Sequence, residues 1–536
     1  MSNIIKYRIS LINTFWIATL LFCVHSPVNA FEHETSPVYF RDYSPESLVA
    51  AKKENKPVFI LISAEWCHWC KVFSEKSLTD EKVFAYLNRF FINLFIDADL
   101  RRDLSLKFGA NRLPYIVLMR PDESIYYKFG GTLYAEDLLS FLKETNDVIK
   151  RGDNPLVNPN KERGFNEKTY QPPIKYDKKA TKRLKNYYME VVYENIDHEE
   201  FGVGMSRKLI LPETFLYLLD QKNSIPTDID GAKAVSNTMK KSVQKIFDQV
   251  EGGFFRYAET QKWEIPHYEK MVDLNAAAFL LLHKLDGNQN NELFEKAARK
   301  TGEYLSLKLY EPGVGSFLSF QAADENYYKM NKEERSSAKE PKIINKIFTD
   351  RLSRALIYLI DALEYINDNA FMKKVKRSVD FLHAMSIQNI YHFYSVPKKE
   401  WSVHGNLADY VFLSYLFMRA SEVFEEPEYE KSVLKIANLL MKKFYDSNRN
   451  IFIDKLPGAN RDMEYLLELN GIVSLTWLKL SKDSPREDML DAINNVIKFF
   501  SKVEPLLQES VWSKQNFNFL DRYVPYLRAV ELYNNR

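Results

Sequence analysis

The order of apolar and polar positions divides the chain into two regions of different character. In the first region, from about residue 37 to residue 149, short continuous apolar runs alternate with amphipathic stretches. The runs at 58–62, 91–96 and 115–119 are typical of strands buried on both faces, because such strands have no solvent side that would require alternation. This region therefore predicts a mixed sheet with helices on both of its faces. The other elements expected here are strands at 38–40 and 124–129 and helices at 48–53, 81–90 and 135–150.

The second region, from about Asp177 onward, repeats a helical pattern. Apolar residues recur there at helical spacing, and glycine or proline marks the short breaks between the stretches. Roughly 360 residues, at about 25–35 residues per helix pair, give about ten to fourteen helices, which suits a toroid of helical hairpins. A polar and charged stretch at 331–342 is expected to be a mobile loop between two hairpins. The clearest predicted helices lie at 279–285, 352–365, 410–423, 433–444 and 472–480.

Breaks in these patterns set the expected domain boundaries. Prolines among charged and polar residues, without apolar periodicity, indicate a linker at 151–175. This linker separates an α/β domain at 31–150 from an all-α domain at 176–536. Residues 1–30 form a separate segment with the features of an export signal.

That first segment predicts a cleaved signal peptide. Lys6 and Arg8 precede an apolar stretch at 15–24, which is short for a membrane span. Small residues at the end of the segment predict cleavage after Ala30, and an uncleaved membrane anchor is the alternative. Because no later stretch is apolar enough to span a bilayer, the mature protein is expected to be soluble and exported, most simply to a bacterial periplasm.

Composition narrows the classes of function. The chain has 536 residues and a formal net charge of +2, which argues against a nucleic-acid partner. Three residues are cysteine, and Cys23 lies in the predicted signal peptide. The mature protein would then hold only Cys67 and Cys70, so these two thiols either bond each other or react with an external partner.

The motif Trp66-Cys67-His68-Trp69-Cys70-Lys71 carries the leading chemistry. It follows the buried run at 58–62, where a helix is expected to begin. The free N–H groups and the dipole of a helix start favour a thiolate, so the pKa of the Cys67 thiol should fall. His68 can add positive charge beside it, and Cys70, one turn further on, is placed to attack a mixed disulfide formed at Cys67.

Other residues are expected to complete this site. Trp66 and Trp69 flank the pair and can offer a docking surface, while Pro114 precedes a buried strand and is a natural cis-proline opposite the thiols. The alternatives to a redox site are a structural disulfide and a zinc site. A two-residue spacing constrains the unfolded chain little, and two cysteines lack the two further ligands of a zinc site. Thiol–disulfide exchange is therefore the leading hypothesis, with no metal or cofactor expected.

These residues resemble the thioredoxin superfamily. The matching points are the cysteine motif after a buried strand, Pro114 before the next strand pair, and Gly130-Gly131 before the last helix. The resemblance covers about residues 36–150. It implies a thioredoxin fold with Cys67 as nucleophile, Cys70 as resolving thiol and Pro114 as the cis-proline.

One position departs from the thioredoxin pattern. Thioredoxins usually carry a buried acid on the strand before the motif, and the matching residue here is Leu61. That acid helps proton transfer to the buried thiol. Its absence implies a slow or selective redox site, unless Glu65 or His68 takes its place.

A second set of motifs lies in the helical region. Gly252-Gly253-Phe254-Phe255-Arg256-Tyr257 is followed by Trp263-x-x-Pro266-His267-Tyr268-Glu269-Lys270-Met271. Together with the cysteine motif, they resemble the family of spermatogenesis-associated thioredoxin-domain proteins and their bacterial relatives, over nearly the whole mature chain. The resemblance implies a thioredoxin-like α/β domain followed by an all-α (α/α)6-type toroid, like those of sugar epimerases and glycosidases.

The inner polar set of the toroid departs from this family pattern, although the cysteine motif is intact. Leu274 and Ala408 stand where the family has acids, and Arg351-Leu352 stand where it has Trp-Asn. The toroid is therefore expected to bind a ligand or protein rather than to catalyse a reaction.

The sequence thus predicts an exported thiol–disulfide oxidoreductase whose partner is a protein thiol or disulfide, selected by the toroid. One alternative is a carbohydrate-active enzyme or sugar-binding protein that uses the toroid cavity, where Glu269, Asp350 and Asp409 could supply facing carboxylates. Another is a non-catalytic binding or scaffold protein. The expected substrate-binding residues are Trp66, Trp69, Arg256, Trp263, His267, Glu269, Asp350, Asp409 and Tyr410.

Overall fold

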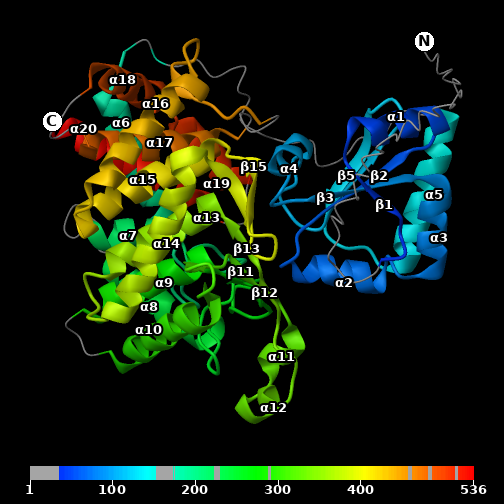
Figure 1. Cartoon of the computed structure of the whole chain (residues 1–536), viewed down its shortest axis with the longest axis horizontal. Helices are drawn as coiled ribbons and strands as arrows, with labels where there is room; N and C mark the ends of the chain where they lie inside the picture. The colour runs from blue at the N-terminus through cyan, green and yellow to red at the C-terminus, as the bar shows by residue number, and fades with distance from the viewer. Residues whose placement is uncertain are drawn as a thin grey trace, which may run out of the picture.

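The structure is a computed structural model. It describes residues 36–152, 173, 175–221, 230–287, 291–456, 462–480, 486–513 and 517–536. The predicted signal peptide and most of the predicted linker lie outside these residues. Two bodies lie side by side, a smaller one built around a sheet and a larger one built of helices (Figure 1). Within the described residues, no helix is both long and apolar enough to cross a membrane.

The smaller body contains a five-stranded mixed sheet with the order β1-β3-β2-β4-β5. β1 and β2 run parallel to β3, while β4 runs antiparallel to both β2 and β5. Two of the three inner strands, β2 and β4, are buried along their whole length, as their continuous apolar runs predict. The strands are β1 (Phe40–Asp42), β2 (Val58–Ser63), β3 (Ile92–Asp97), β4 (Tyr115–Met119) and β5 (Ile125–Gly130).

Helices cover both faces of this sheet. Leu87 and Leu138, from α3 and α5, pack with α2 residues against one face, whereas Leu104 and Phe108 of α4 pack against the other face with α1. α4 is a short charged segment that the sequence pattern does not predict as a helix. The helices are α1 (Pro45–Glu54), α2 (His68–Lys76), α3 (Glu81–Phe90), α4 (Arg102–Phe108) and α5 (Ala135–Arg151).

The larger body is a ring of helices inside a second ring. The inner helices pack in the sequence α7, α9, α13, α15, α17 and α20, and α20 packs back against α7, which closes the ring. The outer helices alternate with them along the chain. The inner helices are α7 (Pro212–Asp220), α9 (Val272–Asp286), α13 (Thr349–Ala362), α15 (Leu407–Phe424), α17 (Met463–Leu480) and α20 (Val524–Asn534); the outer ones are α6 (Lys178–Glu194), α8 (Gly231–Lys245), α10 (Glu292–Tyr304), α14 (Asn369–Gln388), α16 (Pro427–Lys443) and α18 (Glu487–Phe500), with α19 (Glu504–Ser513) packed on α6.

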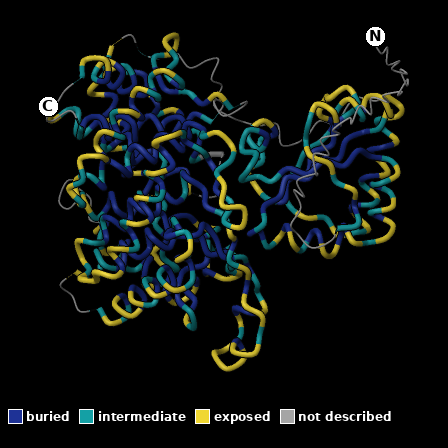
Figure 2. Tube along the Cα trace, viewed as in Figure 1, coloured by how far each residue is buried: buried dark blue, intermediate teal, exposed yellow. Residues whose placement is uncertain are grey.

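The inner helices are buried on nearly every side. Every residue from Met463 to Leu478 of α17 is buried, because its neighbours in the ring and the outer layer cover it all round. A helix in such a place is apolar around its whole circumference rather than along one stripe. Figure 2 shows the buried positions following the strands of the sheet and the inner helices. The expected fold class, a thioredoxin-like domain followed by an (α/α)6-type toroid, is confirmed.

Short strands, which the sequence pattern does not predict, link the helices of the toroid. Two three-stranded sheets, ordered β12-β11-β8 and β13-β14-β15, occupy the side that faces the thioredoxin-like domain (Figure 1). These sheets provide most of the contacts described below. Their strands are β8 (Lys270–Met271), β11 (Phe320–Gln321), β12 (Ile343–Ile344), β13 (Lys346–Phe348), β14 (Tyr391–Ser395) and β15 (Glu400–His404).

The polar stretch at 331–342 is not the loop that the sequence predicts. It contains a helical turn, α12 (Lys332–Ser336), which begins with a capping box formed by Asn331 and Glu334. Arg335 on this turn is buried and forms ion pairs with Asp248 and Glu251. This charged stretch thus contains a buried arginine that fixes it to the toroid by ion pairs, and composition alone does not reveal that contact.

Candidate functional site

The cysteine pair lies at the N-terminus of α2. Cys67 is the N-cap residue, and its Sγ accepts a hydrogen bond from the Cys70 N–H at 3.2 Å. The two sulfurs are bonded to each other, and the Cα atoms are 5.3 Å apart. Cys67 thus stands at the positive end of a helix, the position that favours a thiolate after reduction.

Pro114 follows a cis peptide bond with Leu113, as the sequence predicts. Leu113 packs against the cluster that contains both cysteines. The loop before β4 therefore lies beside the disulfide, in the arrangement that the thioredoxin resemblance implies.

The toroid covers the disulfide. Cys67 is 5% exposed and Cys70 is 1% exposed, because both lie in an apolar cluster to which the two domains contribute. Little of Cys67 is therefore exposed to a protein disulfide in this arrangement. The toroid residues of this interdomain cluster are Met271, Phe320, Ile344, Phe348 and Phe393, and the thioredoxin-like domain adds Ala64 and Trp66.

The two tryptophans of the motif have different surroundings. Trp66 is buried, donates from Nε1 to Asp99 Oδ2 at 2.7 Å, and lies beneath the guanidinium of Arg256, 4.8 Å from its ring centre. Trp69 is 39% exposed and meets the His68 ring edge-on. Trp66 therefore docks against the protein's own toroid, and of the two rings Trp69 is the one accessible to a partner.

Glu269 reaches from the toroid to the first turn of α2. Its Oε1 accepts a hydrogen bond from the His68 N–H at 3.1 Å, and the residue is 1% exposed. Oε2 lies 3.9 Å from His267 Nδ1 and accepts no hydrogen bond in the described residues. The other imidazole nitrogen of His267, Nε2, lies 3.1 Å from Glu259 Oε2. Burial lowers the pKa of His267, so the imidazole is neutral at pH 7.

A belt of ion pairs surrounds the apolar cluster. Glu65, beside the motif, pairs with Lys342 and Lys346 of the toroid. Burial alone would raise the pKa of Glu65, but the two ammonium groups hold it below its usual value. Arg102 of α4 reaches Asp350 at 3.1 Å and lies over the Tyr465 ring. Glu65 is therefore engaged in docking. Within the described residues, its carboxylate forms no hydrogen bond with Cys67 or Cys70.

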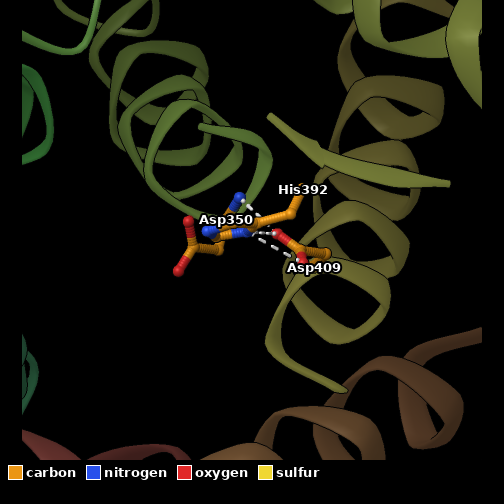
Figure 3. Close-up of side chains that lie close together, drawn as sticks. All are labelled: Asp350, His392 and Asp409. Atoms are coloured by element: carbon orange, nitrogen blue, oxygen red, sulfur yellow. Dashed lines mark hydrogen bonds and ion pairs between the residues drawn. The ribbon is translucent and has the colours of Figure 1, made fainter. Parts of the chain in front are cut away.

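Asp350, His392 and Asp409 form a compact cluster where α13, β14 and α15 meet (Figure 3). Their ligand atoms lie within 4.8 Å of one another, close enough for a metal ion. However, His392 Nδ1 contacts both oxygens of Asp409 at 2.9 and 3.0 Å, and Nε2 contacts the carbonyl oxygen of Asp99 at 3.0 Å. Both ring nitrogens must carry protons to donate these bonds, so the imidazole has no lone pair for a metal.

The charge on His392 follows from this arrangement. Burial opposes protonation, but the adjacent Asp409 carboxylate outweighs it and raises the pKa of His392 to about 9. Burial likewise opposes ionisation of Asp350, yet His392 and Arg102 hold its pKa below the usual value. The cluster is therefore an interdomain ion-pair junction, since His392 and Arg102 connect it to the thioredoxin-like domain.

Two expected substrate-binding residues are instead part of the toroid interior. Trp263 is fully buried, and its Nε1 donates to the carbonyl oxygen of Glu200 at 2.9 Å. Tyr410 is also buried, and its hydroxyl accepts a hydrogen bond from Lys443 Nζ at 2.6 Å. Neither side chain is open to a ligand, because neighbouring helices and loops enclose both.

A narrow cavity lies on the axis of the inner ring. It measures about 60 Å³ and is lined by residues of five inner helices, with Arg354, Tyr358 and Phe412 among them. Pockets that hold small molecules usually measure about 300–1,000 Å³. The cavity on the ring axis is thus several times smaller than a typical ligand pocket.

Several residues that shape the site lie outside the motifs found in the sequence. Asp97 ends β3, Asp99 follows two residues later, and Arg102 begins α4. Burial and repulsion from Asp99 raise the pKa of Asp97 to about 6. The sequence contains one signal for these residues. Acidic residues at the end of a buried parallel strand mark the sheet edge that carries the site. His392 carries no such local signal, because its role depends on the second domain.

Comparisons with known proteins agree with this architecture. A family model described as "Protein of unknown function, DUF255" (Thioredox_DsbH) matches residues 23–127. Spermatogenesis-associated protein 20 from Rattus norvegicus is 26% identical over 316 residues, which cover 55% of this chain and 40% of that protein. Protein disulfide-isomerase tigA from Aspergillus niger is 32% identical over 124 residues, covering 23% of this chain and 33% of that protein. The chain thus spans about two fifths of the length of the mammalian relatives it matches.

Solved structures show partial likeness to each domain. Cellobiose 2-epimerase from Bacillus thermoamylovorans matches 60% of this chain and 87% of its own, with 10% identity and a TM-score of 0.49. A structure described as DsbH oxidoreductase matches 21% of this chain and 85% of its own, with 14% identity and a TM-score of 0.20. The chain is thus similar to spermatogenesis-associated protein 20 over about half of its length, and residues 23–127 match the thioredoxin-like family model.

Proposed function

We propose that this protein is a thiol–disulfide oxidoreductase whose active disulfide, Cys67–Cys70, is covered by its own toroid. The proposal rests on one observation: the disulfide begins a helix beside a cis-proline in a thioredoxin-like domain. A disulfide that closes so small a loop is a poor structural staple. The same bond at a helix N-terminus is suited to reversible exchange.

The exchange follows from the geometry of the pair. In the reduced protein, the Cys67 thiolate attacks a substrate disulfide, forming a mixed disulfide and releasing one substrate thiolate, which takes up a proton. Cys70 then loses its proton and attacks Cys67 Sγ, forming the Cys67–Cys70 bond and releasing the second substrate thiol. Two electrons pass to the substrate, and the reverse sequence oxidises a substrate dithiol.

The domains must separate for either direction to proceed with a protein partner. The toroid residues that cluster with the pair leave Cys67 5% exposed, too little for a protein partner to reach Sγ without a change. The docked arrangement is therefore a closed state, and the belt of ion pairs sets how often it opens. In the open state, Trp66 and Trp69 both become available to a partner.

The proposed location is outside the cytoplasm, as a periplasmic or otherwise exported protein. The support is the N-terminal segment with Lys6, Arg8 and the expected cut after Ala30. A disulfide persists more readily in an exported protein than in the reducing cytosol.

The carbohydrate alternative has less support. Glu269, Asp350 and Asp409, the candidate carboxylates, all contact groups that tie the toroid to the thioredoxin-like domain or to the ion-pair junction. The narrow cavity on the ring axis adds no room for a sugar.

The decisive experiment traps a mixed disulfide. In Cys70→Ala, the Cys67 thiolate can attack a substrate but nothing resolves the product, so a covalent complex should accumulate in cells. The matched control is Cys67→Ala, which should trap nothing. Equilibration of the purified wild-type protein in glutathione buffers should also show reversible conversion between disulfide and dithiol. An empty trap together with a pair that never cycles would refute the proposal.

A further inference from the structure

The Glu269 carboxylate lies at the N-terminus of α2, where the helix end would otherwise stabilise a thiolate at Cys67. Its Oε1 holds the His68 N–H, which belongs to the first residue of α2 and directly follows Cys67. This carboxylate comes from the toroid, so it is at the redox centre only while the domains are docked. Its second oxygen, Oε2, is buried and accepts no hydrogen bond within the described residues.

The segment that carries Glu269, directly before β8, is firmly anchored. The next residue, Lys270, is fully buried and donates from Nζ to Asp248 Oδ2 and to the carbonyl oxygen of Gly252, each at 2.8 Å. Met271 follows in the apolar cluster against the cysteines. With the next two residues fixed, the Glu269 carboxylate stays at α2 for as long as the toroid is docked.

Within the described residues, the Glu269 carboxylate forms no ion pair with an Arg or Lys side chain. His267 is the nearest basic group, and it is neutral at pH 7 because burial lowers its pKa. Lys270 points away to Asp248, and Arg256 lies over the Trp66 ring. From the thioredoxin-like domain, Asp99 accepts the Trp66 Nε1–H through one oxygen, and its other oxygen lies 3.9 Å from the guanidinium of Arg351 in the toroid. A thiolate at Cys67 would therefore lie near one carboxylate, that of Glu269, which no Arg or Lys side chain of the described residues pairs.

We propose that Glu269 is a positioning residue of the redox centre: in the docked protein its charge disfavours the Cys67 thiolate and so holds the pair as a disulfide. This inference rests on the proposed thiol–disulfide function. Undocking removes the carboxylate, frees the His68 N–H, and restores the thiolate-stabilising helix end. The toroid thus controls the redox state of the pair as well as access to it.

The balance of the exchange shows which direction Glu269 favours. Reduction by glutathione converts the disulfide and two glutathione thiols into the dithiol and one glutathione disulfide. When Cys67 ionises in the reduced protein, one proton is released and a negative charge appears at the start of α2. A fixed carboxylate beside that charge raises the free energy of the reduced form only, so the reduction potential becomes more negative.

The test is the charge-neutral variant Glu269→Gln in the full chain. Its amide oxygen can still accept the His68 N–H, so docking is retained while the charge is lost. We expect the equilibrium constant for reduction by glutathione to rise about tenfold, equivalent to about 30 mV. The pKa of the Cys67 thiol, read from thiolate absorbance in the ultraviolet, should fall. The matched control is Glu264→Gln, the same change at an exposed position of the same segment.

Two further measurements keep the outcomes distinct. If wild type equilibrates with glutathione but Glu269→Gln has the wild-type potential and thiol pKa, the role of Glu269 is refuted while the oxidoreductase function stands. If wild type does not equilibrate at all, the proposed function itself fails. Should Glu269→Gln not fold, the undocking variant Arg102→Ala tests the same point, because separation also removes Glu269 from α2 and should raise the potential. An unchanged potential in an undocked protein would overturn the inference.

Discussion

Arg102 connects the two domains, and its removal should open the closed state. Its guanidinium donates to Asp350 Oδ2 at 3.1 Å and lies 4.7 Å from the centre of the Tyr465 ring. Its side chain is 29% exposed, and that of Asp350 is 14% exposed. Arg102→Ala removes both contacts and leaves the Asp350 carboxylate without its partner from α4.

The size of the effect follows from these contacts. Truncating one partner of a buried, hydrogen-bonded charge pair costs about 2–5 kcal/mol of association. Partial exposure of Arg102 allows solvent screening, so the lower end of about 2 kcal/mol applies. At about 1.4 kcal/mol per tenfold change, the open population should rise roughly 30-fold.

The assay is the rate at which a phosphine reductant opens the Cys67–Cys70 bond, followed by alkylation of the new thiols. If the pair reacts only in the open state and docking is fast, the rate is proportional to the open population. Arg102→Ala should therefore be reduced roughly 30-fold faster than wild type, by the same conversion.

The neighbouring Arg101 provides the control. It pairs with Asp103 inside the thioredoxin-like domain at 2.8 Å, so Arg101→Ala should react at the wild-type rate. Equal rates for Arg102→Ala and wild type, with unchanged circular dichroism, would show that access to the pair does not depend on docking.

Two more predictions concern the junction and the toroid interior. The pKa of His392 is about 9 when docked and about 6.5 when free. Its contribution to docking stability is therefore complete below pH 6.5 and is lost as pH rises through 9. Phosphine reduction of wild type should accelerate over that range, and the extra acceleration should be absent in His392→Gln. Trp263→Ala should lower the free energy of unfolding by about 3–5 kcal/mol in denaturant titrations, with the potential of the pair unchanged. The exposed Trp69→Ala should cost much less stability, and equal losses for the two would contradict the interior position of Trp263.

The sequence predicts the elements of the thioredoxin-like domain well, because local signals define them. β2 and β4 are continuous apolar runs, Asp80 caps α3, and Pro114 precedes β4. α4 escapes prediction because only Leu104 and Phe108 of this short helix are buried. It nevertheless carries Arg102, which shows how a weak local pattern can hide a docking residue.

For the toroid, the sequence predicts the presence of the helices but not their contacts with the thioredoxin-like domain. Motif spacing identifies Glu269 as a candidate residue, yet assigns it to a ligand cavity. Its actual neighbour, the His68 N–H, lies 201 positions earlier in the chain, and no periodicity links positions so far apart. The same limit applies to the apolar residues over the disulfide, which read as ordinary core positions.

Closure of the inner ring has a consequence for biosynthesis. α20 follows every other ring helix in the chain, and the ring is complete only when α20 packs against α7. N-terminal domains generally fold first during synthesis, so the thioredoxin-like domain forms while the cover over Cys67 is still unfinished. The pair therefore stays accessible until the toroid residues that cluster with it are in place.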